Sequence, residues 1–61
     1  MPVVKIELLE GRSLEQKREM ATKITDIVSE VGKTAKENIF VVFDEYPKTN
    51  WAVGGTLYSD K

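Results

Sequence analysis

The chain has 61 residues, of which 41% are apolar, and its nine basic and ten acidic side chains give a net charge of −1. Cysteine and histidine are both absent, which excludes disulfide bonds and the usual zinc, haem and iron–sulfur sites. The slightly acidic balance argues against binding to nucleic acids, and no apolar run is long enough to cross a membrane.

Residues 2–9 predict a β-strand with one buried face. The even positions Pro2, Val4, Ile6 and Leu8 are all apolar, whereas the odd positions are mixed. Alternation with a period of two is typical of a strand that packs on one side. Proline is tolerated at the first position of a strand, where its missing N–H costs no ladder hydrogen bond.

A long amphipathic helix is predicted from about Leu14 to Val31. Ser13 and Gln16 form a capping box at its start, and Gly32 is placed to end it. An apolar stripe with helical spacing is formed by Met20, Ile24, Ile27, Val28 and Val31.

The continuous apolar run Ile39–Phe43 predicts a second strand, buried on both faces. A strand, a helix and a strand in this order form a βαβ unit with two parallel strands. One helix can cover only one face of such a pair, and a 61-residue chain has little further core to offer. We therefore expect another subunit to cover the second face, so that the core depends on oligomer formation.

The rest of the chain is predicted to be turns and a small hairpin. Residues 44–50 are rich in turn formers, and the adjacent carboxylates Asp44 and Glu45 are expected to be solvated. Residues 51–58 predict a short hairpin with Gly54 and Gly55 at its bend. A hairpin of this length is not stable alone, so it is expected to pack on a neighbouring subunit. The fold class is α+β, as one domain over residues 1–61.

Pro2 is the first candidate for chemistry, because a chain without histidine needs another base near neutral pH. Initiator methionine is normally removed before a small residue such as proline, which would leave a secondary amine at the terminus. An α-amino group has an ordinary pKa of about 7.7–8.0, and apolar or cationic surroundings would lower it towards the range of a general base. The alternative is that Pro2 only starts a strand.

Arg12 and Trp51 are the other candidates. Arg12 lies just before the predicted helix start, where a guanidinium could bind a carboxylate, or it is a solvated turn residue. Trp51, the single tryptophan, could line an apolar site or pack at a subunit interface. Lys5 and Lys48 are possible anion contacts, although surface solvation is the simpler interpretation.

The order of these features resembles the 4-oxalocrotonate tautomerase family, also called the 2-hydroxymuconate tautomerases. Pro2 is followed by Leu8-Leu9-Glu10-Gly11-Arg12-Ser13, then by Glu15-Gln16-Lys17, a second strand, and Trp51-Ala52-Val53-Gly54-Gly55. The resemblance covers essentially the whole chain. It implies a βαβ unit with a C-terminal hairpin, assembled as a hexamer, a trimer of dimers.

The resemblance also implies roles for individual residues. Pro2, after loss of Met1, would be the general base of a keto–enol tautomerase, and Arg12 would bind the substrate carboxylate. Trp51 would keep the site apolar. Phe40 stands where some members carry a further arginine from a neighbouring subunit, so a monocarboxylate enol becomes as plausible a substrate as a dicarboxylate. Dehalogenation, known in some relatives, is disfavoured because Ala52 and Val53 supply no carboxylate.

The expected function is that of a cofactor-independent isomerase that converts 2-hydroxy-2,4-dienoates or related enols to 2-oxo acids, as in the degradation of aromatic compounds. No metal or organic cofactor is implied. A cytoplasmic homo-oligomer is expected, because residues 1–5 lack signal-peptide features and the absence of cysteine fits a reducing compartment. The alternative is a non-catalytic, oligomeric βαβ module that binds small molecules or serves a structural role.

Overall fold

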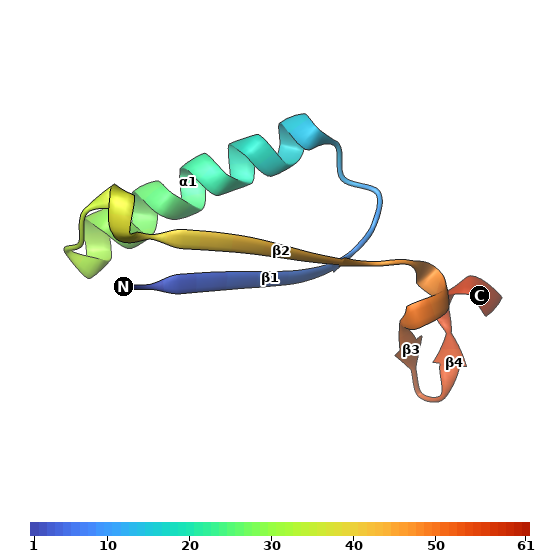
Figure 1. Ribbon diagram of the computed structural model, residues 1–61. Helices are drawn as coiled ribbons and strands as arrows, with labels where there is room; N and C mark the ends of the chain where they lie inside the picture. Colours follow the sequence, from blue (N-terminus) through green and yellow to red (C-terminus); the bar gives the residue numbers. More distant parts are fainter.

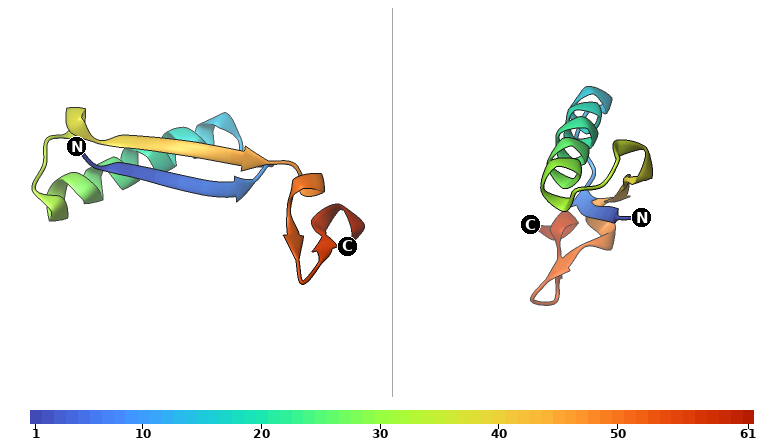
Figure 2. Two further views of the ribbon diagram at one scale, coloured as in Figure 1. Left: turned by 60° about the horizontal axis from the view of Figure 1, so that its bottom comes forward. Right: turned by 90° about the vertical axis from the view of Figure 1, so that its left-hand side faces the viewer.

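The computed structural model describes all 61 residues and contains the predicted βαβ unit (Figure 1). Its elements are β1 (Val3–Leu9), α1 (Leu14–Gly32), β2 (Phe40–Tyr46), β3 (Ala52–Val53) and β4 (Thr56–Leu57). β1 and β2 pair in parallel, with Val3 opposite Phe40 and Leu9 opposite Tyr46. The helix lies along one face of this two-stranded sheet (Figures 1 and 2). None of the helices combines the length and the apolarity that crossing a bilayer requires.

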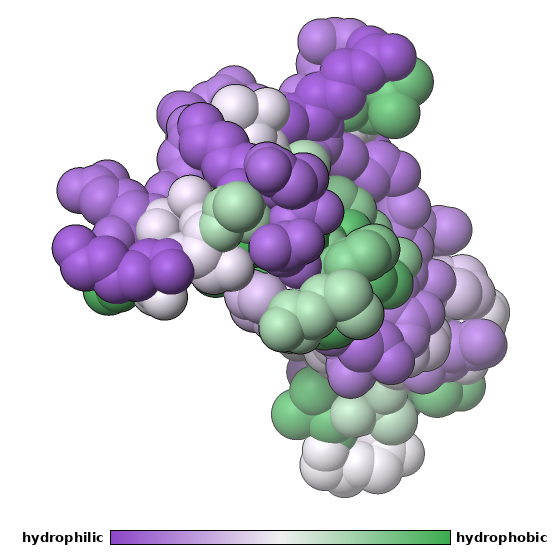
Figure 3. Space-filling view, turned by 60° about the vertical axis from the view of Figure 1, so that its left-hand side comes forward, coloured by the Kyte–Doolittle hydropathy of each residue, from purple (hydrophilic) through white to green (hydrophobic).

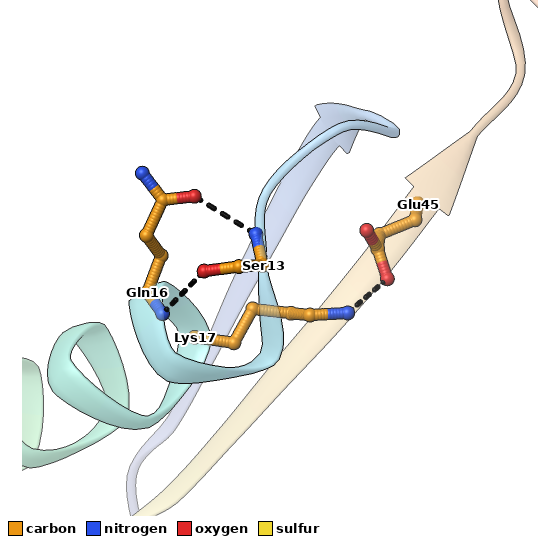
Figure 4. Close-up of polar contacts among 4 residues, drawn as sticks. All are labelled: Ser13, Gln16, Lys17 and Glu45. Carbon is orange, nitrogen blue, oxygen red and sulfur yellow. Dashed lines mark hydrogen bonds and ion pairs between the residues drawn. The ribbon is translucent and has the colours of Figure 1, made fainter.

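The helix begins where the sequence predicts but ends differently. The Ser13 side chain accepts from the Gln16 N–H, and the Gln16 side chain accepts from the Ser13 N–H, as expected of a capping box (Figure 4). Gly32, predicted to end the helix, still lies within it, and the left-handed residue is Lys33, with φ of 55°. Both Lys33 and Thr34 donate their N–H groups to the Ser29 carbonyl, which ends the helix without a glycine.

β2 is longer than predicted, because it continues through Asp44, Glu45 and Tyr46. Both carboxylates stay partly open to solvent, as expected, with side chains 37% and 30% exposed, but they lie in a strand and not in a turn. They point to opposite faces of the sheet, and each pairs with a lysine there. Lys5 Nζ lies 3.2 Å from Asp44 Oδ2. Lys17 Nζ lies 2.6 Å from Glu45 Oε1 (Figure 4). These partners come from β1 and α1, so local sequence does not reveal them.

The single chain leaves its core open, as expected. No residue is buried, and the chain exposes 4640 Å² of surface, against about 4000 Å² for a compact monomer of this mass. Its radius of gyration is 14.7 Å, against about 10.5 Å for a compact chain of this length. Phe40 and Val42 remain 47% and 44% exposed on the sheet face away from α1. Apolar surface is visible between the polar side chains in Figure 3.

The predicted apolar stripe on the helix is only partly covered. Met20, Ile24 and Val28 are half-buried towards the sheet, whereas Ile27 and Val31 are 60% and 74% exposed. The stripe is wider than the two strands can cover, because a two-stranded sheet is narrow. Ile27 and Val31 therefore belong to the apolar surface that the single chain leaves open.

The C-terminal hairpin has the predicted bend. β3 and β4 pair antiparallel, and between them Gly54 and Gly55 have φ of 59° and 89°. Two consecutive residues with positive φ are typical of the type I′ turn, for which glycine is favoured. The hairpin projects beyond the end of the sheet (Figure 2), where the chain itself offers it little to pack on.

Ser13→Ala should lower the free energy of unfolding by about 1 kcal/mol, because it leaves the Gln16 N–H without its cap. Urea unfolding followed by circular dichroism at a fixed protein concentration measures this. Ser59→Ala is the matched control, since Ser59 is exposed and its hydroxyl makes no hydrogen bond within the chain. An unchanged midpoint in Ser13→Ala would mean that the capping box does not stabilise the helix.

Candidate active site

Pro2 and Phe40 lie together at the end of the sheet where β1 and β2 begin. The Phe40 N–H donates to the Pro2 carbonyl at 3.0 Å, which fixes Pro2 from its carboxyl side. Met1 lies outside β1 and is 87% exposed. While Met1 is attached, the Pro2 nitrogen is an amide with no basic lone pair. Removal of Met1 would free that nitrogen without breaking any ladder hydrogen bond.

Arg12 lies at the opposite end of β1, in the segment that leads into α1. Its side chain is exposed and makes no ion pair, whereas the other arginine, Arg18, is paired with Glu15. It borders a shallow depression on α1 that also includes Met20 and Ile24. A free guanidinium beside apolar side chains is suited to bind the carboxylate of a partly apolar ligand.

The segment that carries Arg12 is fixed on both sides. The Glu10 N–H donates to the Tyr46 carbonyl at 2.9 Å, and the Ser13 capping box starts the helix immediately after Arg12. Gly11, between them, has φ of 132°, which favours glycine over residues with a side chain. The backbone therefore holds Arg12 in place while its side chain stays free.

Trp51 also lies beyond this end of the sheet, between β2 and the hairpin. Its ring contacts Tyr46 edge-on, with 5.8 Å between the ring centroids and 60° between the ring planes. Its carbonyl accepts a hydrogen bond from the Tyr58 N–H at 2.8 Å. Trp51 is half-buried by these contacts and remains partly open to solvent.

The single chain places the four predicted residues at two ends of the sheet, and only Pro2 and Phe40 are in direct contact. Pro2 lies with Phe40, and Arg12 lies towards the Trp51 end, separated from Pro2 by the length of β1. Seven residues of strand span about 20 Å. No depression on the chain includes both Pro2 and Arg12. A site that uses all four residues requires the base end of one chain to meet the other end of a second chain.

Sequence reasoning missed a polar cluster on the sheet face away from α1, formed by Lys5, Asp44 and Tyr46. The Tyr46 hydroxyl donates to Asp44 Oδ2 at 2.8 Å, and Lys5 pairs with the same oxygen. These two contacts lower the pKa of Asp44, and donation to the carboxylate raises the pKa of Tyr46. In a strand, the spacing Asp-x-Tyr places the side chains of Asp44 and Tyr46 on one face, but the composition of residues 44–50 predicts turns instead.

Comparison with known proteins agrees with this architecture along the whole chain. The family model described as "Tautomerase enzyme" matches residues 2–61. A Listeria innocua protein named a probable tautomerase is 48% identical over 60 residues, which cover 98% of each chain. A solved 4-oxalocrotonate tautomerase homologue gives a TM-score of 0.96 at 41% identity, over 100% of this chain and 97% of that one.

A second solved structure bears on assembly. It is described as a heterohexameric 4-oxalocrotonate tautomerase from Chloroflexus aurantiacus. It gives a TM-score of 0.90 at 32% identity, over 98% of this chain and 97% of that one. Family model, sequence and structure agree, and the chain belongs to the tautomerase family of isomerases.

Proposed function

We propose that this protein is a cofactor-independent keto–enol tautomerase in which Pro2, once Met1 is removed, is the general base. Its substrates are 2-hydroxy-2,4-dienoates or related enols, and its products are 2-oxo acids. The observation that carries the proposal is the family match over residues 2–61, which includes Pro2, Arg12 and Trp51 together. The exposed Met1, outside every strand, supports it, because its loss would cost no packing.

The proton balance of the reaction needs a single base. The Pro2 amine takes the proton from the 2-hydroxyl group, and the O–H electrons form the new C=O bond. The conjugated double bonds shift by one position, and C5 of the dienoate takes the proton back from the Pro2 ammonium. The substrate's own oxygen carries the negative charge between the two transfers, so stabilising that charge is the remaining task of the site.

Arg12 is proposed to bind the substrate carboxylate and to draw charge towards the oxygen end of the molecule. Its guanidinium is free of intramolecular partners, so binding does not require breaking an ion pair first. Trp51 is proposed to wall the site around the bound substrate and exclude water, which strengthens the ion pair between the substrate carboxylate and Arg12.

The site is proposed to form between subunits of a cytoplasmic homo-oligomer, a hexamer. Support comes from the open core, from the distance between Pro2 and Arg12 within one chain, and from the heterohexameric relative. The Pro2 and Phe40 of one chain would meet the Arg12 and Trp51 of another. Each chain then takes part in two sites and contributes one half of each.

Phe40 is proposed to favour an apolar group at the end of the substrate nearest Pro2. Its side chain is 47% exposed and its N–H bonds the Pro2 carbonyl, so Phe40 lies at the same end of the sheet as the proposed base. A second carboxylate at that position would lose its hydration without gaining a cation. The substrate class that fits best is therefore a monocarboxylate enol with an apolar substituent.

An ultraviolet assay with phenylenolpyruvate and 2-hydroxymuconate tests both the activity and the substrate class. Intact mass must first show that Met1 is absent. We expect the ratio of kcat/KM for the monocarboxylate over the dicarboxylate to fall by about 10-fold or more in Phe40→Arg, because a charge-assisted hydrogen bond contributes about 1.5–3 kcal/mol. Phe43→Leu, on the helix side of the sheet, is the control that should leave the ratio unchanged.

Two results would contradict this proposal. A preparation without Met1 that is inactive on both enols would argue against a tautomerase, and an unchanged ratio in Phe40→Arg would argue against the role of Phe40. Met1 retained in protein from its native source would favour the non-catalytic module instead, because the Pro2 nitrogen would then be an amide.

A further inference from the structure

Tyr46, at the end of β2, connects the two candidate residues at this end of the molecule. Its carbonyl accepts from the Glu10 N–H at 2.9 Å and so fixes the segment that carries Arg12. Its ring meets the edge of Trp51 at 5.8 Å between centroids. Its hydroxyl donates to Asp44 Oδ2 at 2.8 Å. Tyr46, which is half-buried, therefore contacts Trp51 directly and holds the segment that carries Arg12 through Glu10.

The Tyr46 hydroxyl is held by a carboxylate that is itself fixed. Asp44 and Tyr46 are two residues apart in β2, so their side chains share the sheet face away from α1. Lys5 in β1 reaches the same Asp44 oxygen at 3.2 Å. Glu7 stands directly opposite Asp44 in the neighbouring strand, and the positive charge of Lys5 offsets the repulsion between these two carboxylates.

We propose that Tyr46 is a positioning residue that orients Trp51 in the substrate site, with its own ring held by Asp44 and Lys5. This rests on the proposed role of Trp51 as a wall of that site. An edge-to-face contact constrains the plane of the partner ring, and the hydroxyl bond to Asp44 prevents the Tyr46 ring from turning out of that contact. The contacts that run from Lys5 through Asp44 and Tyr46 thereby fix the position of Trp51, which lies outside the sheet, relative to the two strands.

The position of Tyr46 predicts which kinetic constant it affects. Tyr46 lies at the Arg12 end of its own chain and touches no residue that takes part in proton transfer. A misplaced Trp51 weakens the packing around bound substrate equally in the ground state and the transition state. Loss of such uniform binding raises KM and leaves kcat nearly unchanged.

The experiment combines kinetics with the fluorescence of Trp51, which is the only tryptophan in the chain. In Tyr46→Leu we expect acrylamide to quench Trp51 about twofold more strongly, and KM to rise about 2- to 10-fold, because the aromatic contact is lost. Tyr46→Phe keeps the ring and loses only the hydroxyl, so it should show the same changes at smaller size. Gel filtration establishes that each variant keeps its assembly.

A double-mutant cycle tests the Asp44 link. Asp44→Asn and Tyr46→Phe each remove part of the same hydrogen bond, so the double variant should change Trp51 quenching no more than the larger single change. Tyr58→Phe is the matched control, since the Tyr58 hydroxyl makes no hydrogen bond within the chain. That variant should leave both quenching and KM as in the parent protein.

The outcomes separate this inference from the proposed function. Unchanged quenching in both Tyr46 variants would overturn the positioning role, and altered quenching with unchanged KM would overturn its connection to substrate binding. If Tyr46→Leu fails to assemble, Tyr46→Phe decides the question alone. Failure of the tautomerase proposal would appear instead as unchanged activity when Pro2 is replaced, and Pro2 lies outside the cluster of Lys5, Asp44 and Tyr46.

Discussion

Replacement of Pro2 by leucine should lower kcat/KM for the enol substrate by about 10²–10⁴-fold, the usual contribution of a general base. Leucine is too large for efficient removal of the initiator methionine, so Met1 stays attached and the residue 2 nitrogen becomes an amide. The only free terminal amine is then that of Met1. It lies one residue, about 3.8 Å, before the position of the proline nitrogen, which is too far to replace it.

Pro2→Ala is the matched comparison. Alanine permits methionine removal and leaves a primary amine at the same position, so the loss should be clearly smaller than in Pro2→Leu. Intact mass establishes the terminus of each variant, and circular dichroism and gel filtration establish fold and assembly. Because β1 begins at Val3, neither change removes a strand residue. Full activity in Pro2→Leu with Met1 retained would rule out the terminal amine as the base.

Arg12→Gln should lower kcat/KM by about 10- to 150-fold, because the substrate carboxylate loses a charge-assisted contact of about 1.5–3 kcal/mol. The stability of the protein should not change, since the Arg12 side chain has no intramolecular partner to lose. Arg12→Lys should recover only part of the loss, because an ammonium cannot bind a carboxylate through two parallel hydrogen bonds. Steady-state kinetics and urea unfolding measure the two effects separately.

Arg18→Gln is the matched control for Arg12→Gln. Arg18 is the other arginine, it is exposed on α1, and it pairs only with Glu15. We expect activity within about twofold of the parent protein, because exposed helical ion pairs contribute little. Equal losses in the two variants would show that Arg12 acts only through the net charge of the surface.

Mixing the two impaired variants tests where Arg12 acts. If Pro2 and Arg12 of different chains form one site, Pro2→Leu and Arg12→Gln chains unfolded and refolded together should regain part of the activity. Each variant refolded alone should keep only its own residual activity. No recovery in mixed oligomers of the normal size would place both residues of a site in one chain, contrary to the length of β1.

Local signals in the sequence predicted most of the fold. The alternation in residues 2–9, the capping box at Ser13 and the glycine pair at 54–55 each depend on near neighbours, and the structure confirms all three. The error at the end of β2 came from contacts between distant elements. Asp44 and Glu45 have polar, turn-forming side chains, but lysines on β1 and α1 allow them to stay in the strand. The left-handed Lys33 depends on Ser29, one helical turn earlier.

The arrangement of the candidate site could not be predicted from the sequence. Pro2, Arg12, Trp51 and Phe40 came from a resemblance, which gives positions along the chain and says nothing of distances. The length and parallel pairing of β1 and β2 place Pro2 and Arg12 at opposite ends. Tyr46 escaped notice because its role depends on the Trp51 contact, which no spacing in the sequence indicates.

The separation of Pro2 from Arg12 along β1 has a consequence for how the activity responds to dilution. Each chain on its own holds one half of each of two sites and no complete site, so dissociation removes catalysis even where the secondary structure persists. Specific activity should therefore fall as the protein is diluted below the dissociation constant of the interface between the two halves. A substrate that contacts both subunits of a site should reduce this loss of activity on dilution, because its binding also stabilises the assembly.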